Sequence, residues 1–300
     1  MPGAEVDVTA DLVRRLLAEQ QPDLARLPVT PLSNGWDNTL FRLGQDLVAR
    51  LPRRALAAGI VRNEQRWLPV LAPRLPLPIP VPVRIGEPAA GYPWAWSVVA
   101  YLPGTPASDD PPLDLAGAAR TLGGFLAALH APAPPEAPAN PYRGVPLADR
   151  AENFAKNLDM LTGHVDRAAV QAAWAEALAA APYAGPPRWL HGDPHPANIL
   201  VSDGQVSGML DFGDITAGDP ATDLSLAWMM LPREHHGAFR AAYRAATTAH
   251  ANTTTPPDDD ALWRRARGWA LNLAIVFLAW SADNPRLRTV GERTLHSVLR

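Results

Sequence analysis

The sequence contains no cysteine, a single lysine and no apolar run of membrane-spanning length. Without cysteine, neither disulfides nor thiolate-held metal sites can form. The longest apolar run, residues 269–280, is interrupted by Asn272, whereas a membrane span needs roughly 20 apolar residues. We therefore expect a buried helix there. The N-terminus has early acidic residues and no apolar core followed by a cleavage site, so we expect no signal peptide. These absences favour a cytoplasmic protein with no membrane partner.

Charge and size set further limits. The net charge is −3, from 27 basic and 30 acidic residues, so no nucleic-acid partner is expected. A chain of 300 residues with 47% hydrophobic content can bury a sizeable core in one or two domains. The single lysine is Lys156, and every other basic residue is arginine. Any cation that binds phosphate elsewhere in this chain must therefore be an arginine.

The first third of the chain has the pattern of a small mixed lobe. Thr9 can cap a helix with Leu12, Val13, Leu16 and Leu17 on one face. Eight prolines from Pro69 to Pro93 exclude a long helix there. The residue pattern predicts a helix over 60–71 and five strands, over 29–32, 39–43, 47–51, 81–85 and 96–102. We expect residues 1–102 to form an antiparallel five-stranded lobe with one inserted helix.

The remaining chain is mostly helical by pattern. We expect residues 103–300 to form a larger lobe that follows the Pro103-Gly104 boundary, so the fold class is α+β with two lobes. A proline-rich segment, residues 131–146, is expected to be an exposed insertion. The cleft between the lobes is the default ligand site. Helices are predicted over 113–130, 148–161, 166–180, 219–230, 235–250, 259–282 and 285–299.

The stretch from His191 to Asp223 organises the second lobe. Two short apolar runs, 199–201 and 206–210, are predicted to be strands joined by a turn at Asp203-Gly204. This hairpin would hold Asp193 and Asn198 just before its first strand and Asp211 just after its second. Three oxygen-bearing side chains would then lie at one edge, a composition that suits a hard cation and a hydroxyl group.

Phosphoryl transfer from a nucleotide to an alcohol requires such groups. A carboxylate must orient the hydroxyl and accept its proton, oxygen ligands must hold Mg²⁺, and a cation must contact the phosphates. Asp193 can be the base, and Asn198 and Asp211 can bind the metal. The protein-kinase pattern places Asn five residues after the catalytic Asp and ends in Asp-Phe-Gly, as in HGDPHPAN and 211–213 here. Arg50, in LVAR at 47–50, occupies the place of the usual lysine, and Glu64 is its expected partner.

The sequence resembles the aminoglycoside phosphotransferase family, kinase-like enzymes that include macrolide kinases. The resemblance rests on HGDPHPANIL, the Asp211 segment and GDPATDLSLAW at 218–228. It implies a protein-kinase-like bilobal fold, Asp193 as catalytic base, Asn198 and Asp211 on Mg²⁺, and ATP or GTP as donor. It implies a hydroxyl acceptor on a small molecule such as an aminoglycoside or macrolide. Three groups of nucleotide contacts are expected. Ser33, Asn34 and Gly35 belong to a phosphate-covering loop (33–38), and Val99 and Tyr101 belong to a hinge. The other expected contacts are Val48, Arg50, Glu64, Leu200 and Leu210.

Two alternatives remain open from the sequence. His191, Asp193 and His195 alternate as H-x-D-x-H, a spacing that also suits a metal-dependent hydrolase. A kinase fold that has lost catalysis and only binds is the second alternative, favoured by the missing lysine and by the single glycine of the 33–38 loop. The acceptor, the choice between ATP and GTP, and the choice between monomer and homodimer are not fixed by the sequence.

Several nearby residues are expected to be structural. His191 should brace the loop, and His195 should be structural or near the acceptor. Asp219 and Asp223 should bond backbone N–H groups or cap the next helix. Arg53 and Arg54 are expected to be solvated. The tryptophans at the following positions are expected to anchor the core: 228, 263, 269 and 280.

Overall fold

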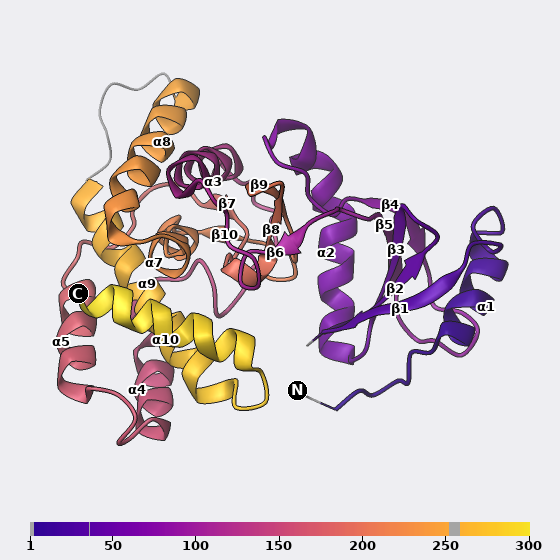
Figure 1. Ribbon diagram of the computed structural model, residues 1–300, viewed down its shortest axis with the longest axis horizontal. Coiled ribbons are helices and arrows are strands. Elements are labelled where there is room, and N and C mark those ends of the chain that lie inside the picture. The colour runs from indigo at the N-terminus through magenta and orange to yellow at the C-terminus, as the bar shows by residue number, and fades with distance from the viewer. Residues whose placement is uncertain (1–2, 36, 252–258) are drawn as a thin grey trace. The chain divides into compact units, whose positions relative to one another are not determined.

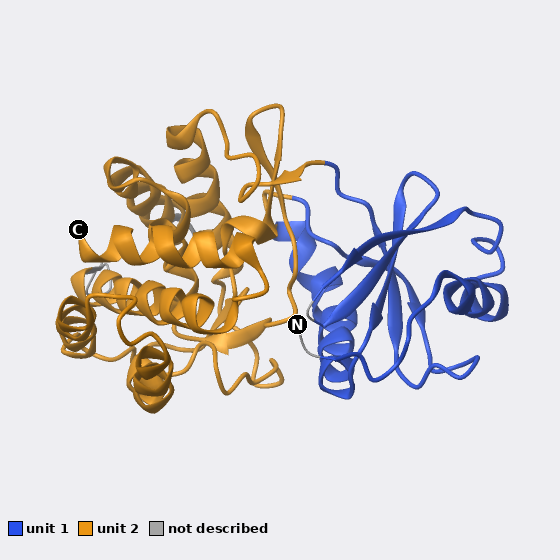
Figure 2. Cartoon of the chain, turned by 60° about the horizontal axis from the view of Figure 1, so that its bottom comes forward, with its two compact units in different colours: residues 1–74, 78–103 blue, residues 75–77, 104–300 orange. Residues whose placement is uncertain are grey.

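The computed structural model describes residues 3–35, 37–251 and 259–300 of the chain (Figure 1). These residues form two compact units, residues 1–74 with 78–103 and residues 75–77 with 104–300 (Figure 2). We call them unit 1 and unit 2. Unit 1 contains α1 (Ala10–Gln20), β1 (Val29–Asn34), β2 (Asn38–Leu43), β3 (Leu47–Pro52), α2 (Ala55–Leu71), the 3₁₀ turn η1 (Ala72–Arg74), β4 (Pro82–Gly86) and β5 (Trp96–Ala100).

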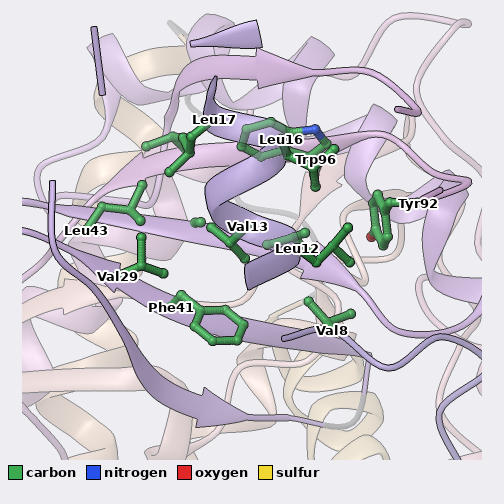
Figure 3. Close-up of a cluster of buried hydrophobic side chains, with 13 residues drawn as sticks. Val8, Leu12, Val13, Leu16, Leu17, Val29, Phe41, Leu43, Tyr92 and Trp96 are labelled. Atoms are coloured by element: carbon green, nitrogen blue, oxygen red, sulfur yellow. The ribbon is translucent and has the colours of Figure 1, made fainter. Parts of the chain in front are cut away.

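Unit 1 is built on one antiparallel sheet with strand order β1-β2-β3-β5-β4. The expected five-stranded sheet is therefore confirmed. Helix α1 begins after Thr9, whose hydroxyl accepts the N–H of Leu12 at 3.2 Å. Its apolar face packs into a cluster with Phe41, Tyr92 and Trp96 (Figure 3). Thus the 3.6-residue period of α1 and the two-residue period of the strands supply one core.

Helix α2 begins at Ala55, earlier than the predicted Ile60. Residues 55–59 lack an apolar stripe, but alanine has a high intrinsic helix propensity. Pro69 lies in the last turn of α2. The helix therefore ends close to the place where the proline-rich sequence begins.

Unit 2 contains the predicted hairpin, β8 (Ile199–Ser202) and β9 (Gln205–Met209). Asp203 and Gly204 both have positive φ, 52° and 73°, as a two-residue hairpin turn requires. Three very short strands were not predicted, because two or three residues carry no readable period. They are β6 (Thr105–Pro106), which pairs with β8, and the mutually paired β7 (Arg188–Leu190) and β10 (Thr216–Gly218).

Helices make up most of unit 2. The predicted helix over 148–161 begins with a 3₁₀ turn, η2 (Leu147–Arg150). The predicted helix over 219–230 is interrupted at Ser225, whose hydroxyl donates to the carbonyl of Thr222 at 2.6 Å. The helices are α3 (Leu115–Leu129), α4 (Ala151–Met160), α5 (Arg167–Leu178), α6 (Ala221–Leu224), α7 (Leu226–Met230), α8 (Arg233–Ala251), α9 (Asp259–Trp280) and α10 (Pro285–Leu299), with the 3₁₀ turn η3 (Pro196–Asn198).

The apolar run 269–280 lies in α9 and is a buried helix over most of its length. Trp263 and Trp269 are core residues, as expected. Trp280 is not, because 57% of it is exposed at the last residue of the helix. Across the described ranges, no helix combines the length and apolarity that crossing a membrane demands.

Two glycines of unit 1 provide a matched test of the packing. A Cβ on Gly86 in β4 would overlap the ring of the fully buried Trp96, whereas a Cβ on Gly59 in α2 meets nothing within 4 Å. We expect Gly86→Ala to lower the free energy of unfolding by about 1–3 kcal/mol through overpacking. Gly59→Ala should raise it by about 0.5–1 kcal/mol. Urea denaturation measures both, and equal effects of the two changes would contradict the packing of Trp96 against β4.

Candidate active site

Residues 191–195 form a tight loop between β7 and η3, and Asp223 holds it. The fully buried carboxylate of Asp223 accepts the N–H of His191 at 2.7 Å and the N–H of Gly192 at 2.9 Å. Its Oδ2 lies 3.2 Å from Nε2 of His130. Gly192 has φ 90° and packs against the backbone of Asp214, so no side chain fits there. The expected backbone-bonding role of Asp223 is confirmed. Because His191 and Gly192 are held in this way, the backbone position of Asp193, which follows them, is fixed as well.

His191 braces the loop, as expected. Its Nε2 lies 2.8 Å from the carbonyl of Leu210, and its Nδ1 accepts the N–H of Asp193 at 3.2 Å. Both ring nitrogens are therefore engaged, and the side chain is fully buried. Within the described ranges, no group of three or more His, Asp or Glu side chains could hold a metal ion. The engagement of both ring nitrogens of His191 counts against the H-x-D-x-H hydrolase interpretation.

Backbone and amide bonds tie the three predicted groups into one connected segment. The Nδ2 of Asn198 donates to the carbonyl of Asp193 at 3.1 Å, and the carbonyl of Asn198 accepts the N–H of Leu210 at 2.7 Å. Asp211 follows with φ 58° and accepts the N–H of Gly213 at 3.3 Å. A positive φ at a non-glycine residue is uncommon and concentrates at functional sites.

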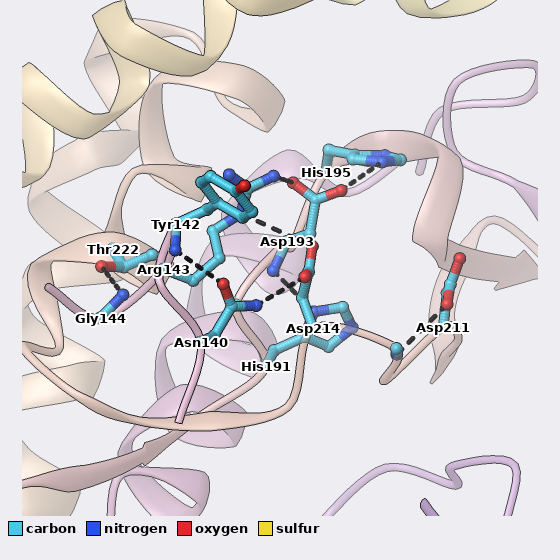
Figure 4. Close-up of polar contacts among 12 residues, drawn as sticks. Asn140, Tyr142, Arg143, Gly144, His191, Asp193, His195, Asp211, Asp214 and Thr222 are labelled. Carbon is cyan, nitrogen blue, oxygen red and sulfur yellow. Dashed lines mark hydrogen bonds and ion pairs between the residues drawn. The ribbon is translucent and has the colours of Figure 1, made fainter. Parts of the chain in front are cut away.

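The oxygens of this segment fit a hard cation. Because Nδ2 of Asn198 is used by the loop, its Oδ1 is the atom available to a metal ion. Asp211 is exposed and lies to one side of the Asp193 cluster (Figure 4). A carboxylate and an amide oxygen, with water and phosphate oxygens completing the shell, are the ligands that Mg²⁺ prefers.

Asp193 is held as a carboxylate by a residue that the sequence did not indicate. Its Oδ1 lies 3.1 Å from the guanidinium of Arg143, and its Oδ2 lies 3.5 Å from Nε2 of His195. Burial alone would raise the pKa of Asp193, but the charge of Arg143 and the hydrogen bond from His195 outweigh burial and hold that pKa below its ordinary value of 3.8. Asp193 is therefore ionised at neutral pH.

The proline-rich segment 131–146 has no buried residue, as expected of an exposed insertion, but its stretch from Asn140 to Gly144 also forms part of this site. Asn140 donates to Asp214 at 2.7 Å, and the carbonyl of Gly144 accepts the N–H of Asp219 at 3.0 Å. Arg143 from the same segment reaches both Asp193 and Asp214 (Figure 4). The signal in the sequence was the polar side chains of Asn140, Tyr142 and Arg143, which lie among the prolines.

Asp214 is a second carboxylate of this site, and the sequence did not indicate its role. Its Oδ2 lies 3.6 Å from Nε of Arg143. Burial and the negative charge of Asp193 raise the pKa of Asp214, although Arg143 opposes this shift. Asp193 and Asp214 share Arg143, yet the pKa of Asp193 is lowered and the pKa of Asp214 is raised.

His195 and Asp219 have the structural positions expected of them. His195 is buried, 3.3 Å from Nδ2 of Asn198, with its ring against the edge of Phe277 at a centroid distance of 5.5 Å. Asp219 accepts the N–H of Ala221 at 3.0 Å and pairs with the buried Arg265 at 2.7 Å.

In unit 1 the expected ion pair is present. The guanidinium of Arg50 in β3 lies 2.9 Å from the carboxylate of Glu64 in α2, and both side chains are almost fully buried. Val48 and Val99 are register partners on adjacent strands. Tyr101 follows β5, and the guanidinium of Arg42 lies 3.2 Å from its ring centroid. Of the two predicted nucleotide-contacting leucines, Leu200 is in β8 and Leu210 directly follows β9.

The loop after β1 is clamped by two arginines that we expected to be solvated. Arg53 donates to Oδ1 of Asn34 and to the carbonyl of Gly35, both at 3.1 Å, and Arg54 pairs with Asp37. Arg53 is buried, and the side chain of Arg54 is only 15% exposed, so neither residue is solvated as expected. Ser33 and Asn34 lie at the end of β1, whereas Trp36 of the same loop lies outside the described residues.

The fold and the loop chemistry together define a phosphotransferase of kinase-like architecture. The model of the phosphotransferase enzyme family matches residues 28–269, and the chain belongs to that family. None of the curated proteins matches this chain.

Solved structures similar to this chain support the fold. The GDP and kanamycin complex of APH(2")-IIia has 19% identity over 95% of this chain and 97% of its own, with a TM-score of 0.66. The macrolide 2'-phosphotransferase MphH from Brachybacterium faecium has 21% identity over 95% and 97%, with a TM-score of 0.60. The streptomycin–ATP–APH(2")-IIa ternary complex has 16% identity over 93% and 92%, with a TM-score of 0.59. The expected kinase-like fold is therefore confirmed.

The opposite pKa shifts of Asp193 and Asp214 predict opposite pH dependence of stability. Ionised Asp193 stabilises the fold above pH 3.8, and this contribution is lost as the pH falls through its lower folded-state pKa. The stability advantage of the wild type over Asp193→Asn should therefore shrink on acidification from about pH 6 to about pH 3. Urea unfolding at several pH values measures this difference.

Asp214→Asn is the matched control. Because the folded-state pKa of Asp214 is raised, its ionisation costs stability as the pH rises above 3.8. The variant should therefore gain stability relative to the wild type over that rise. Slopes of the same sign for the two variants would contradict the assigned ionisation states.

Proposed function

We propose that this protein transfers the γ-phosphoryl group of a nucleoside triphosphate, with Mg²⁺, to a hydroxyl of a small molecule. One observation carries the proposal. Asp193 is held ionised in a loop whose backbone N–H groups are bound by Asp223. The side-chain amide of Asn198 donates a hydrogen bond to the carbonyl of Asp193. A fixed carboxylate with an oxygen ligand five residues later is the arrangement that phosphoryl transfer to an alcohol needs.

In the proposed step, Asp193 orients the acceptor hydroxyl and accepts its proton. The acceptor oxygen forms a bond to the γ-phosphorus while the bond from that phosphorus to the β-bridging oxygen breaks. The products are a phosphate monoester, a nucleoside diphosphate and a proton on Asp193. Because the transition state is loose, positioning and charge neutralisation supply most of the rate.

Asn198 and Asp211 would hold the Mg²⁺ that neutralises the donor phosphates. In unit 1, Arg50 fills the role usually given to lysine, and its pairing with Glu64 supports this assignment. Arginine is always charged and can contact two phosphate oxygens at once. Residues 33–35, Val48, Val99, Tyr101, Leu200 and Leu210 are proposed to contact the nucleotide.

The first acceptors to test are antibiotics. The similar structures include complexes with kanamycin and with streptomycin and a macrolide phosphotransferase. Both GDP and ATP occur in those complexes, so both triphosphates belong in the assay. We propose a cytoplasmic location, because nucleoside triphosphates and Mg²⁺ are plentiful there.

Asp193→Ala tests the catalytic base. We expect kcat to fall by on the order of 10²–10⁴ because proton transfer and hydroxyl alignment are lost, while nucleotide affinity is retained. Coupled nucleotide-consumption kinetics and nucleotide titration measure the two quantities. The control is Asp159→Ala, an exposed α4 carboxylate bonded to Arg167, which should leave both unchanged.

The same experiment separates catalysis from binding alone. Undiminished turnover in Asp193→Ala would remove the base assignment. Stabilisation of the wild type by nucleotide, without transfer to any alcohol, would favour the inactive binding module instead.

Asp211→Ala tests the metal site. Because Asp211 would supply the charged oxygen ligand, we expect Mg²⁺-dependent nucleotide binding to be lost. Calorimetric titration with and without Mg²⁺ makes the comparison. An unchanged Mg²⁺ dependence would contradict the role.

A further inference from the structure

A cavity of about 340 Å³ in unit 2 lies one residue away from the proposed catalytic base. Arg143 and Asp214 line it, and Arg143 also contacts Asp193. We call this cavity the acceptor pocket. It lies at the lower end of the volume range of small-molecule sites. A molecule bound there would have Asp193 within the same connected cluster of side chains.

The charge of the acceptor pocket is set by Arg150, which also lines it. Arg143 is already paired with two carboxylates, Asp193 and Asp214. Arg150 is 7% exposed, and among the described residues no hydrogen bond or ion pair reaches its guanidinium. The ring of Tyr142 lies beside it, with the ring centroid 5.3 Å from the guanidinium carbon. Among the residues that the structure describes, no carboxylate forms an ion pair with this buried guanidinium, although the charge of Asp149 acts on it.

Arg265 shows how a buried structural arginine is bonded in this chain, and its bonding differs from that of Arg150. Arg265 is equally buried, yet it bonds both carboxylate oxygens of Asp219 and the carbonyl of Ala181 at distances from 2.6 to 3.3 Å. Burial, and then the charge of Arg143, lower the pKa of Arg150. A buried cation without a partner costs free energy. An anion in the pocket would offset that cost.

The remaining wall of the pocket is partly aromatic. Trp280 is 57% exposed, and its Nε1 donates to Oδ1 of Asn157 at 2.9 Å, which fixes the indole at the rim. Tyr142 provides a second ring. The wall can therefore cover the apolar face of a ligand while Asn157 and Arg150 contact its polar groups.

We propose that the acceptor carries a carboxylate or a phosphate, which Arg150 binds, in addition to the hydroxyl that approaches Asp193. This inference rests on the proposed function and narrows its substrate class. A polycationic acceptor would be repelled by Arg150 and would meet Asp214 only in competition with Arg143. Anionic hydroxyl compounds, rather than aminoglycosides, are the substrate class that fits the acceptor pocket.

The test uses matched acceptors that differ in charge. Galacturonate, galactose 6-phosphate, galactose, galactosamine and kanamycin are assayed with ATP and with GTP by transfer of labelled γ-phosphate. We expect transfer only to anionic compounds, and the comparison of galacturonate with galactose 6-phosphate distinguishes carboxylate from phosphate.

Variants connect the charge preference to Arg150. Arg150→Gln should raise KM for the anionic acceptor roughly 10- to 100-fold, the worth of a hydrogen bond to a charged group, with a smaller change in kcat. Arg150→Lys should retain part of the affinity. The control is Arg120→Gln, on the exposed face of α3, where the arginine is 61% exposed and 3.9 Å from Asp114. It should leave KM unchanged.

Every outcome decides the inference. Transfer to galactose, galactosamine or kanamycin with a KM that Arg150→Gln does not change would overturn it. If no compound accepts phosphate, calorimetric titration of galacturonate and galactose 6-phosphate decides. Binding that Arg150→Gln abolishes supports the anion site and counts against the proposed transfer to these compounds, whereas absence of saturable binding by either anion overturns the anion site itself.

Discussion

The buried carboxylate of Asp223 is the constraint on which the catalytic segment depends. It accepts two consecutive backbone N–H groups, from His191 and Gly192, and it contacts His130. Nδ1 of His130 lies 2.9 Å from the hydroxyl of Tyr243 in α8, so the loop is connected through one chain of polar groups to the helical body. Charge-assisted bonds of this kind are short and strong in a buried setting. These bonds fix the backbone of the two residues before Asp193 and therefore the position of Asp193 in the loop.

Much of this arrangement could be predicted from the sequence because it is local. The Asp203-Gly204 turn, the strands beside it and the five strands of unit 1 were predicted from period and turn chemistry, which act within a few residues. The backbone role of Asp223 was also predictable, since a buried aspartate after a loop usually bonds N–H groups. The pairing of Arg50 with Glu64 was indicated by motif spacing.

The contacts that were missed join residues distant in the chain. Arg143 reaches Asp193 across 50 residues, and Asn140 reaches Asp214 across 74. No local period records such a pair, and a proline-rich composition favours a loop without indicating what the loop packs against. Arg53 was misjudged for a related reason. Arg53 directly follows β3, whereas its partners are Asn34 at the end of β1 and Gly35 just after it.

The segment 131–146 has a consequence for how this enzyme family can change. Prolines restrict its backbone, and Gly144 anchors its end to the start of α6. Tyr142 and Arg143 nevertheless face the acceptor pocket. Asn140, which donates to Asp214, and Gly144 hold the two ends of this short stretch in place. Replacing the residues between them would therefore alter the charge and shape presented to an acceptor without changing the helices or the catalytic loop. Such a segment is a natural place for related chains to diverge in selectivity, and a practical one for grafting a new preference.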